Sequence, residues 1–306
     1  MKRIVLLISI LILCEFVFSQ TYKEKHANII TEKIIANKQE IINKLGISQD
    51  SIIFLSFWDF DGTIMKGDCS EGMTVNDTLV YKGIAQLAIE SNYSKIYQPK
   101  GGVDIFFNDY RHMDDIGSWL AYPYIIQMLY GTSFKDIYYL SNKHFNDVLS
   151  KYYFKSSMQI INALENNDIQ CHIISASPDV FVKGAAQSIG FDKERFNGIE
   201  VEIENEKLTE KIIYPITWAN GKVEKLKYIP EKIKKQNPNK KLIILAAFGN
   251  SYTTDGPFLK YVATQQFSIA KPISVMINGG KTPKEYENLF IEVNQSEIIG
   301  SVNNKK

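Results

Sequence analysis

The chain has 306 residues, of which 45% are hydrophobic and 23% are charged, and its formal net charge is +1. This is the composition of a globular protein with one large domain or two modest ones. No basic stripe indicates a nucleic-acid partner, and no acidic tail indicates a solvating role.

Residues 1–19 have the layout of a signal peptide. Two basic residues precede an apolar run from Ile4 to Leu13, and Val17-Phe18-Ser19 offers a cleavage site before Gln20. The apolar run is shorter than the ~20 residues that cross a membrane. We therefore expect export, to the periplasm or the medium, with no membrane span after cleavage. The alternatives are an uncleaved anchor and lipidation at Cys14.

Two cysteines, Cys69 and Cys171, remain after such a cleavage. An exported protein can form a disulfide, but two cysteines are not a disulfide framework and lack the histidine partners of a zinc site. We expect two unpaired buried thiols.

The first half of the chain divides into three parts. Residues 23–45 carry isoleucines at helical spacing, and Gly46 ends this predicted helix. Ser51 to Phe60 is an apolar run that predicts a buried strand. Residues 66–151 are mostly helical in pattern, and glycines and prolines interrupt the pattern.

The second half alternates strands and helices. A helix over 156–166 is followed by a strand from Ile169 to Ala176, where Ser177 is expected to cap the next helix. Further patterns predict a hairpin over 197–213 around Asn205, a helix over 221–236, a strand over 242–248, a helix from about Pro257 and a strand over 274–277. Such alternation predicts an α/β fold with a mostly parallel sheet, whose ligand site lies beyond the carboxyl ends of the strands.

The first predicted strand ends in two carboxylates, Asp59 and Asp61, followed by Gly62. Residues two apart on an extended chain point the same way. Beside a Mg²⁺ ion, one carboxylate can act as a nucleophile while the other transfers a proton to the leaving oxygen.

The other predicted strands also end in polar residues. Ser175 can hold a phosphate oxygen near a helix N-terminus. Lys222 opens a helix and can neutralise the transferring phosphoryl group, with Lys225 as the competing choice. Asn250 and Asp255 follow the strand over 242–248 and can offer oxygen ligands to Mg²⁺.

Taken together, these segments resemble the haloacid dehalogenase superfamily, specifically its phosphoserine-phosphatase-like branch. The resemblance is carried by four ordered motifs: DFDGT at 59–63, CHIISAS at 171–177, Lys222 in NGKVEKL, and AAFGNSYTTDGPFL at 246–259. It implies a Rossmann-like core (20–65 and 152–306) and a helical cap of the C1 type inserted after the first strand (66–151).

The resemblance also implies roles for individual residues. Asp59 attacks phosphorus and Asp61 acts as acid and then base. Thr63, Ser175 and Lys222 hold the phosphoryl group. Mg²⁺ is bound by Asp59, Asp61 and the fourth motif, where Asn250 replaces the usual aspartate and Asp255 can supply the missing charge.

Substrate selection is expected in the cap and in the turn after the first motif. Asp68 and Glu71 can bind a cationic group, and Arg111 can bind a carboxylate by a bidentate pair or instead pair with a neighbouring aspartate. The aromatic residues Trp119, Tyr122 and Tyr124 can form a cage for choline or can be core packing.

The sequence thus predicts an exported, Mg²⁺-dependent phosphatase for a small phosphorylated metabolite. A phosphotransferase that uses the same aspartyl phosphate is one alternative. A catalytically weakened binding protein with the same fold is the other, and Asn250 is its only support.

Overall fold

The computed structural model describes residues 26–265 and 270–300. The predicted signal peptide and Cys14 lie outside these residues. Among the helices described, none has both the length and the apolar character needed to cross a membrane.

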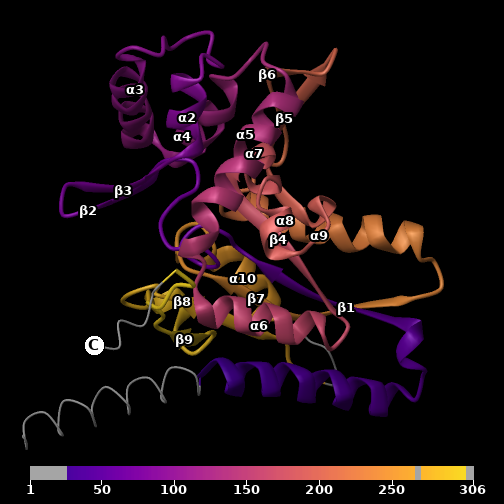
Figure 1. Cartoon of the computed structure of the whole chain (residues 1–306). Coiled ribbons are helices and arrows are strands. Elements are labelled where there is room, and N and C mark those ends of the chain that lie inside the picture. The colour runs from indigo at the N-terminus through magenta and orange to yellow at the C-terminus, as the bar shows by residue number, and fades with distance from the viewer. Residues whose placement is uncertain (1–25, 266–269, 301–306) are drawn as a thin grey trace, which may run out of the picture.

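The core is a seven-stranded sheet with the strand order β6-β5-β4-β1-β7-β8-β9 (Figure 1). Every neighbouring pair is parallel except β5 and β6, which confirms the predicted α/β class. The strands are β1 (Ile52–Trp58), β4 (Ile169–Pro178), β5 (Phe196–Glu204), β6 (Lys207–Ile213), β7 (Lys241–Gly249), β8 (Ile273–Ile277) and β9 (Ile291–Val293).

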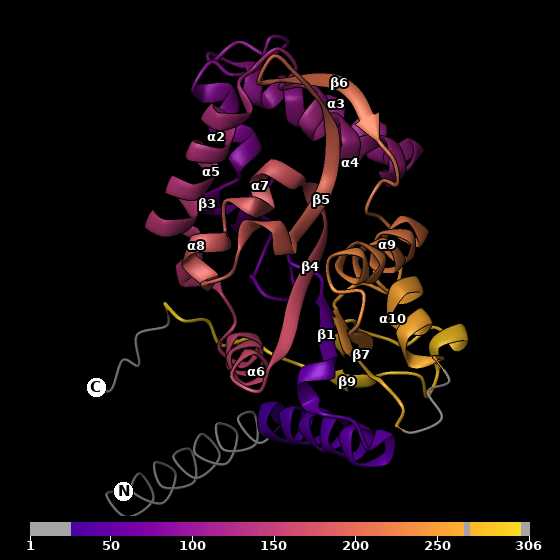
Figure 2. The same cartoon turned by 90° about the vertical axis from the view of Figure 1, so that its right-hand side faces the viewer.

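Helices cover both faces of this sheet, so the central strand β1 is buried along its whole length. Ile53, Leu55 and Phe57 pack in one hydrophobic cluster with α9 (Asn220–Gln236) and α10 (Gly256–Ala263). Phe54 and Trp58 belong to a second cluster that includes α6 (Lys155–Glu165). Figure 2 shows α6 and the α9–α10 pair on opposite sides of the sheet. The core also contains the short helices α7 (Asp179–Lys183) and α8 (Ala186–Ile189) and 3₁₀ turns at Gln49–Ser51, Lys193–Arg195 and Lys284–Tyr286. A further 3₁₀ turn, Leu149–Tyr152, lies where the cap segment returns to the core.

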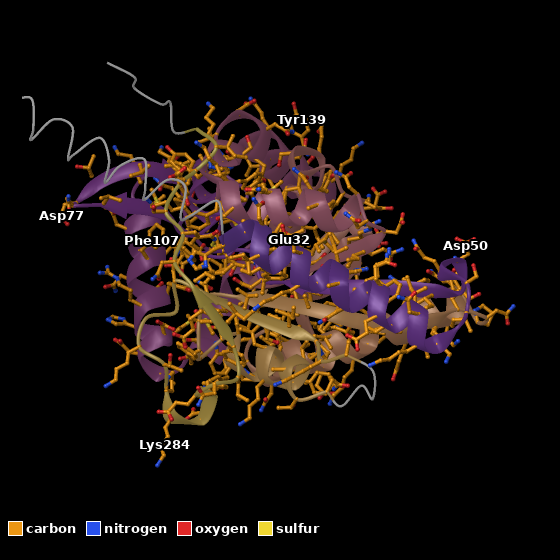
Figure 3. The ribbon with its side chains drawn as sticks, turned by 90° about the horizontal axis from the view of Figure 1, so that it is seen from below. Glu32, Asp50, Asp77, Phe107, Tyr139 and Lys284 are labelled. Carbon is orange, nitrogen blue, oxygen red and sulfur yellow. The ribbon has the colours of Figure 1, made fainter. Side chains whose placement is uncertain are left out.

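The helix over residues 26–45 lies across the base of the core, as Figure 3 shows from below with Glu32 on its outer side. Its inward face is formed by Ala27, Ile30, Ile34 and Ile41. Lys38 is also buried on this face, where its ammonium group lies 5.3 Å from the centroid of the Phe54 ring and donates to the Asn167 carbonyl.

The segment between β1 and α6 forms a separate layer over one end of the sheet (Figure 1). It consists of an antiparallel hairpin, β2 (Gly72–Val75) and β3 (Thr78–Lys82), and of helices α2 (Ile84–Glu90), α3 (Gly102–Ile116), α4 (Ser118–Gln127) and α5 (Phe134–Asp147). We call residues 66–151 the cap.

The β2–β3 hairpin differs from the helical pattern expected for this part of the chain. Its two turn residues, Asn76 and Asp77, both have positive φ angles of 48° and 59°. Asparagine and aspartate tolerate that conformation, which two-residue hairpin turns require. The Asn-Asp pair was therefore the signal for the hairpin.

The predicted hairpin over 197–213 is confirmed as β5–β6, and it extends from the sheet to the cap. The backbone of Leu208 accepts a hydrogen bond from Gly131 (2.7 Å) and donates one to Thr132 (2.9 Å). Phe134 donates to the Glu206 carbonyl at 3.0 Å. The cap is thus joined to the core by this hairpin as well as by its own two chain connections.

Candidate active site

A cavity of about 350 Å³ lies where the carboxyl ends of β1, β4 and β7 face the cap. The core contributes Asp59, Asp61, Ser175, Ser177 and Asn250 to its wall, and the cap contributes Asp68, Glu71, Tyr110 and Tyr122. This is the edge of a parallel sheet at which ligands are expected to bind.

Asp59 is fixed at the end of β1 by both its backbone and its side chain. Its N–H continues the sheet ladder by donating to the Phe248 carbonyl at 2.9 Å. Lys222 Nζ donates to Asp59 Oδ1 at 2.6 Å, and the Thr63 hydroxyl donates to Oδ2 at 2.7 Å. Thr63 is fully buried and is not part of the cavity wall. The structure therefore places Thr63 as a support for Asp59 rather than as the expected phosphate contact.

Lys222 is completely buried between two carboxylates. Its Nζ lies 2.6 Å from Asp59 Oδ1 and 2.6 Å from Asp255 Oδ1. Burial disfavours the ammonium form, but Asp255 and Asp59 outweigh it and raise the pKa of Lys222. The competing residue, Lys225, instead pairs with Glu200. Of the two lysines, Lys222 is therefore the one at Asp59.

Asp255 does not occupy the position expected of a metal ligand. Its Oδ1 is taken by Lys222, and its Oδ2 accepts the N–H groups of Asn250 (2.9 Å) and Ser251 (3.0 Å). Asp255 is absent from the cavity wall. This corrects the expectation that it supplies the anionic ligand, because its side chain lies behind the cavity wall, whereas that of Asp59 lies in it.

With Asp255 excluded, the oxygen groups available to a metal ion come from Asp59, Asn250 and the loop at Asp61. Asn250 lines the cavity beside Gly62, where an added Cβ would lie only 1.9 Å from Asn250 Nδ2. Carboxylate, carbonyl and amide oxygens suit Mg²⁺, so Asp59, the Asp61 backbone carbonyl and the Asn250 amide fit such an ion. No set of three or more His, Cys, Asp or Glu side chains within the described residues could hold one.

Asp61 is held in the cavity wall by donors from both the cap and the core. Its Oδ1 accepts the Cys69 N–H at 2.7 Å, and its Oδ2 accepts the Ser177 hydroxyl at 2.7 Å. Burial, followed by the charges of Asp68 and Asp59, raises the pKa of Asp61 well above its usual range. A carboxyl group in this state can carry a proton near neutral pH, as a general acid must.

Ser177 lines the cavity and does not cap the following helix, which corrects the sequence interpretation. Besides donating to Asp61, its hydroxyl accepts a hydrogen bond from the Ser70 hydroxyl at 3.0 Å. Ser175, the expected phosphate contact, also lines the cavity and accepts the Ser177 N–H at 3.0 Å. The two serines are two residues apart on extended β4, so the spacing that paired Asp59 with Asp61 could have paired them too.

Of the residues expected to select the substrate, two line the cavity and one does not. Asp68 and Glu71 lie in its wall. Arg111 is exposed on α3, where its Nε donates to the Phe107 carbonyl at 3.0 Å. Arg111 therefore does not reach the cavity and cannot provide the expected carboxylate contact there.

Of the three aromatic residues considered for a cage or for core packing, only Tyr122 lines the cavity. Tyr122 lines the cavity together with Tyr110, which the sequence interpretation did not include. The hydroxyl of Tyr124 instead bonds that of Tyr97, and Trp119 is 54% exposed. The cysteines are confirmed as two free, buried thiols.

Replacing Lys222 with methionine should lower the free energy of unfolding by about 3–5 kcal/mol, because two buried carboxylates lose their shared cation. Lys225→Met is the matched control on the same helix and should cost about 1 kcal/mol, since the Lys225–Glu200 pair is partly exposed. Urea unfolding in the presence of EDTA measures both.

The loss of stability in the Lys222→Met variant should also depend on pH. Burial, then Asp255, raises the pKa of Asp59 to about 6, while Lys222 lowers it. Without Lys222 the pKa of Asp59 in the folded state should rise above 6, so the loss should be smallest below pH 6 and should grow as the pH rises above it. Equal losses in both lysine variants, or a loss independent of pH, would contradict this account.

Comparison with solved structures found similar chains of low sequence identity. A protein of unknown function from Bordetella pertussis Tohama I superposes with a TM-score of 0.58 at 12% identity, covering 79% of this chain and 98% of that one. A functionally unknown protein from Anaerococcus prevotii DSM 20548 gives 0.50 at 14% identity, covering 76% and 81%. A substrate-bound phosphoserine phosphatase complex gives 0.44 at 16% identity, covering 78% and 92%.

A sequence comparison with curated proteins gave no significant match. The family model described as haloacid dehalogenase-like hydrolase matches residues 56–260, which is more than half of the chain. That range contains all four of the motifs around the cavity. The chain belongs to the haloacid dehalogenase-like hydrolase family.

Proposed function

We propose that the protein is an exported, Mg²⁺-dependent phosphatase that hydrolyses a small phosphomonoester through a phosphorylated Asp59. The observation that carries this proposal is the contrast between two carboxylates in one cavity wall. Burial raises the pKa of both, but the ammonium group of Lys222 limits the rise at Asp59 to about 6, whereas Asp61 has no cationic partner among the described residues and its pKa lies well above the usual range. Groups with such different environments can act as nucleophile and acid.

In the first step, an oxygen of Asp59 attacks phosphorus and the ester oxygen leaves. The fixed ladder position of Asp59 and its bonds to Lys222 and Thr63 orient the attacking carboxylate. Asp61 gives its proton to the departing alkoxide, so the alcohol leaves neutral. The Ser177 hydroxyl keeps the Asp61 side chain aimed into the cavity.

In the second step, Asp61 is a carboxylate and takes a proton from a water molecule as that water attacks the phosphorus of phosphorylated Asp59. The P–O bond to Asp59 breaks, inorganic phosphate leaves, and both carboxylates return to their starting states. Ser175, which also lines the cavity, can bind a phosphoryl oxygen during both steps, while the Ser177 hydroxyl stays bonded to Asp61.

Asp59, the Asp61 backbone carbonyl and Asn250 are the groups that would hold Mg²⁺. When bound, the ion would offset negative charge on the phosphoryl oxygens and the carboxylates. The cavity wall favours such a cation, because it contains four carboxyl groups and no Lys, Arg or His side chain.

The substitution Asp59→Asn should lower kcat for a generic aryl phosphate by at least about 10³-fold, which corresponds to ~4 kcal/mol of barrier. EDTA should have the same effect on the unsubstituted protein. The assay is release of the phenol by residues 20–306 with and without Mg²⁺, and Asp104→Asn, at an exposed site, is the control. A folded protein that shows no turnover in excess Mg²⁺ would favour the binding-protein alternative.

Adding the missing negative charge at position 250 tests the proposed metal ligands. Asn250→Asp should lower the Mg²⁺ concentration for half-maximal activity by about tenfold, which is ~1.4 kcal/mol. Asn239→Asp, at an exposed turn before β7, should leave it unchanged. If both variants behave alike, Asn250 is not a ligand.

Export is supported by the basic start and short apolar run of residues 1–19. Expression of the full chain in a bacterium should yield an extracytoplasmic protein whose first residue is Gln20. Recovery of the full-length chain from the membrane fraction would instead support an uncleaved anchor, and a modified N-terminal cysteine would support lipidation.

A further inference from the structure

The catalytic cavity has two chemically different ends. The core end holds Asp59, Asp61 and the serines of β4, which the proposed function uses on the phosphoryl group. The cap end is formed by Asp68, Glu71, Tyr110 and Tyr122. Because the alcohol part of a phosphomonoester must extend away from phosphorus, it lies against the cap end.

The cap end carries negative charge that nothing in the described structure offsets. Asp68 and Glu71 form no ion pair with any described lysine, arginine or histidine, and the cavity wall contains no such side chain. A Mg²⁺ ion at Asp59 would serve the other end. Burial raises the pKa of both carboxyl groups, to about 7 for Glu71, where the charge of Asp68 adds to the effect. A bound cation would stabilise their ionised forms, which no described cationic side chain does.

Both carboxylates are held in place while keeping a free oxygen. Asp68 Oδ1 accepts the N–H groups of Ser70 (2.7 Å) and Glu71 (2.8 Å), so this turn is fixed by its own aspartate. The Tyr110 hydroxyl donates to Glu71 Oε1 at 2.8 Å. No described donor bonds Asp68 Oδ2 or Glu71 Oε2, which leaves one oxygen of each for a ligand.

The aromatic side chains add a second kind of attraction for the same ligand. Tyr110 is 4% exposed, and Tyr122 lines the cavity beside it. Tyrosine rings attract ammonium and, above all, quaternary ammonium groups. Carboxylates and tyrosines together form a wall that favours a cation over a neutral or anionic group.

The wall also discriminates against a carboxylate in the substrate. The arginine that the sequence suggested for that contact, Arg111, is exposed and bonded to its own helix. A substrate carboxylate at the cap end would face Asp68 and Glu71 without a counter-charge, which is unfavourable in a partly enclosed site.

We propose that the substrate is the phosphomonoester of an ammonium or trialkylammonium alcohol that has no carboxylate, with its cation bound between Asp68, Glu71 and the two tyrosines. This inference rests on the proposed phosphatase function. It names the substrate class, and the charge of the alcohol is what the site recognises.

The test compares kcat/KM for phosphocholine, phosphoethanolamine, phosphoserine and the dimethylbutyl phosphate in which carbon replaces the quaternary nitrogen. At least one of the two cationic esters should exceed both the carbon isostere and phosphoserine by about tenfold or more. The carbon isostere has the size and shape of phosphocholine without its charge, so it isolates the electrostatic contribution.

Glu71→Gln tests the site itself, since it removes the charge and keeps the shape. It should lower kcat/KM for the preferred cationic ester about tenfold and change that for the carbon isostere by less than about twofold. The matched control is Asp77→Asn, at the exposed tip of the β2–β3 hairpin (Figure 3). It should alter neither value.

Failure of this inference is distinct from failure of the phosphatase proposal. Turnover of an aryl phosphate with no preference for cationic esters, or an equal loss on all esters in Glu71→Gln, would overturn the substrate class alone. If no ester is hydrolysed, the phosphatase proposal fails. Calorimetric titration of phosphocholine against its carbon isostere would then still decide the charge preference.

Discussion

The site depends on one buried contact, the ammonium group of Lys222 between Asp59 and Asp255. Each member comes from a different part of the core: the end of β1, the first turn of α9 and the segment between β7 and α10. A charge with no exposed surface is tolerated only when it is paired and hydrogen-bonded. The contact therefore holds three segments in one arrangement and places the Asp59 carboxylate at the cavity surface with its charge supported from behind.

This contact also gives the acidic residues of the core different surroundings. One oxygen of Asp255 accepts from Lys222, and the other accepts from the backbone of Asn250 and Ser251. Asp255 therefore positions the loop that follows β7. Asp61 has hydrogen-bond donors but no cation, and it faces the cap. One side of the cavity thus has a carboxylate bonded to an ammonium group, and the other has a carboxyl group whose pKa is raised by burial. The β5–β6 hairpin, bonded to the cap backbone, keeps the cap over these groups.

Much of the core could be predicted because its signals are local. Apolar runs that end in a carboxylate or a serine located β1 and β4, and the helix over 26–45 followed from its isoleucine spacing. The short β9 strand and the roles of Thr63, Ser177, Asp255 and Arg111 could not be predicted as readily. They depend on which groups become neighbours across the sheet and the cap. Ser177 looked like a helix cap, and only its contact with Asp61 separates that role from a role in the site. Asp255 precedes α10 at its N-cap position, and its role in the site becomes visible only through its contact with Lys222.

The central claim is that Asp59 becomes covalently phosphorylated. Its most direct test is to quench the protein with acid during turnover, reduce the acyl phosphate with borohydride, and sequence the peptides by mass spectrometry. Borohydride converts a phosphorylated aspartate to homoserine and leaves free aspartate unchanged. The account predicts homoserine at position 59 only when substrate and Mg²⁺ are present. The aspartates at positions 61 and 255 should stay unchanged under all conditions. Turnover with no reduced residue, or reduction at another aspartate, would contradict it.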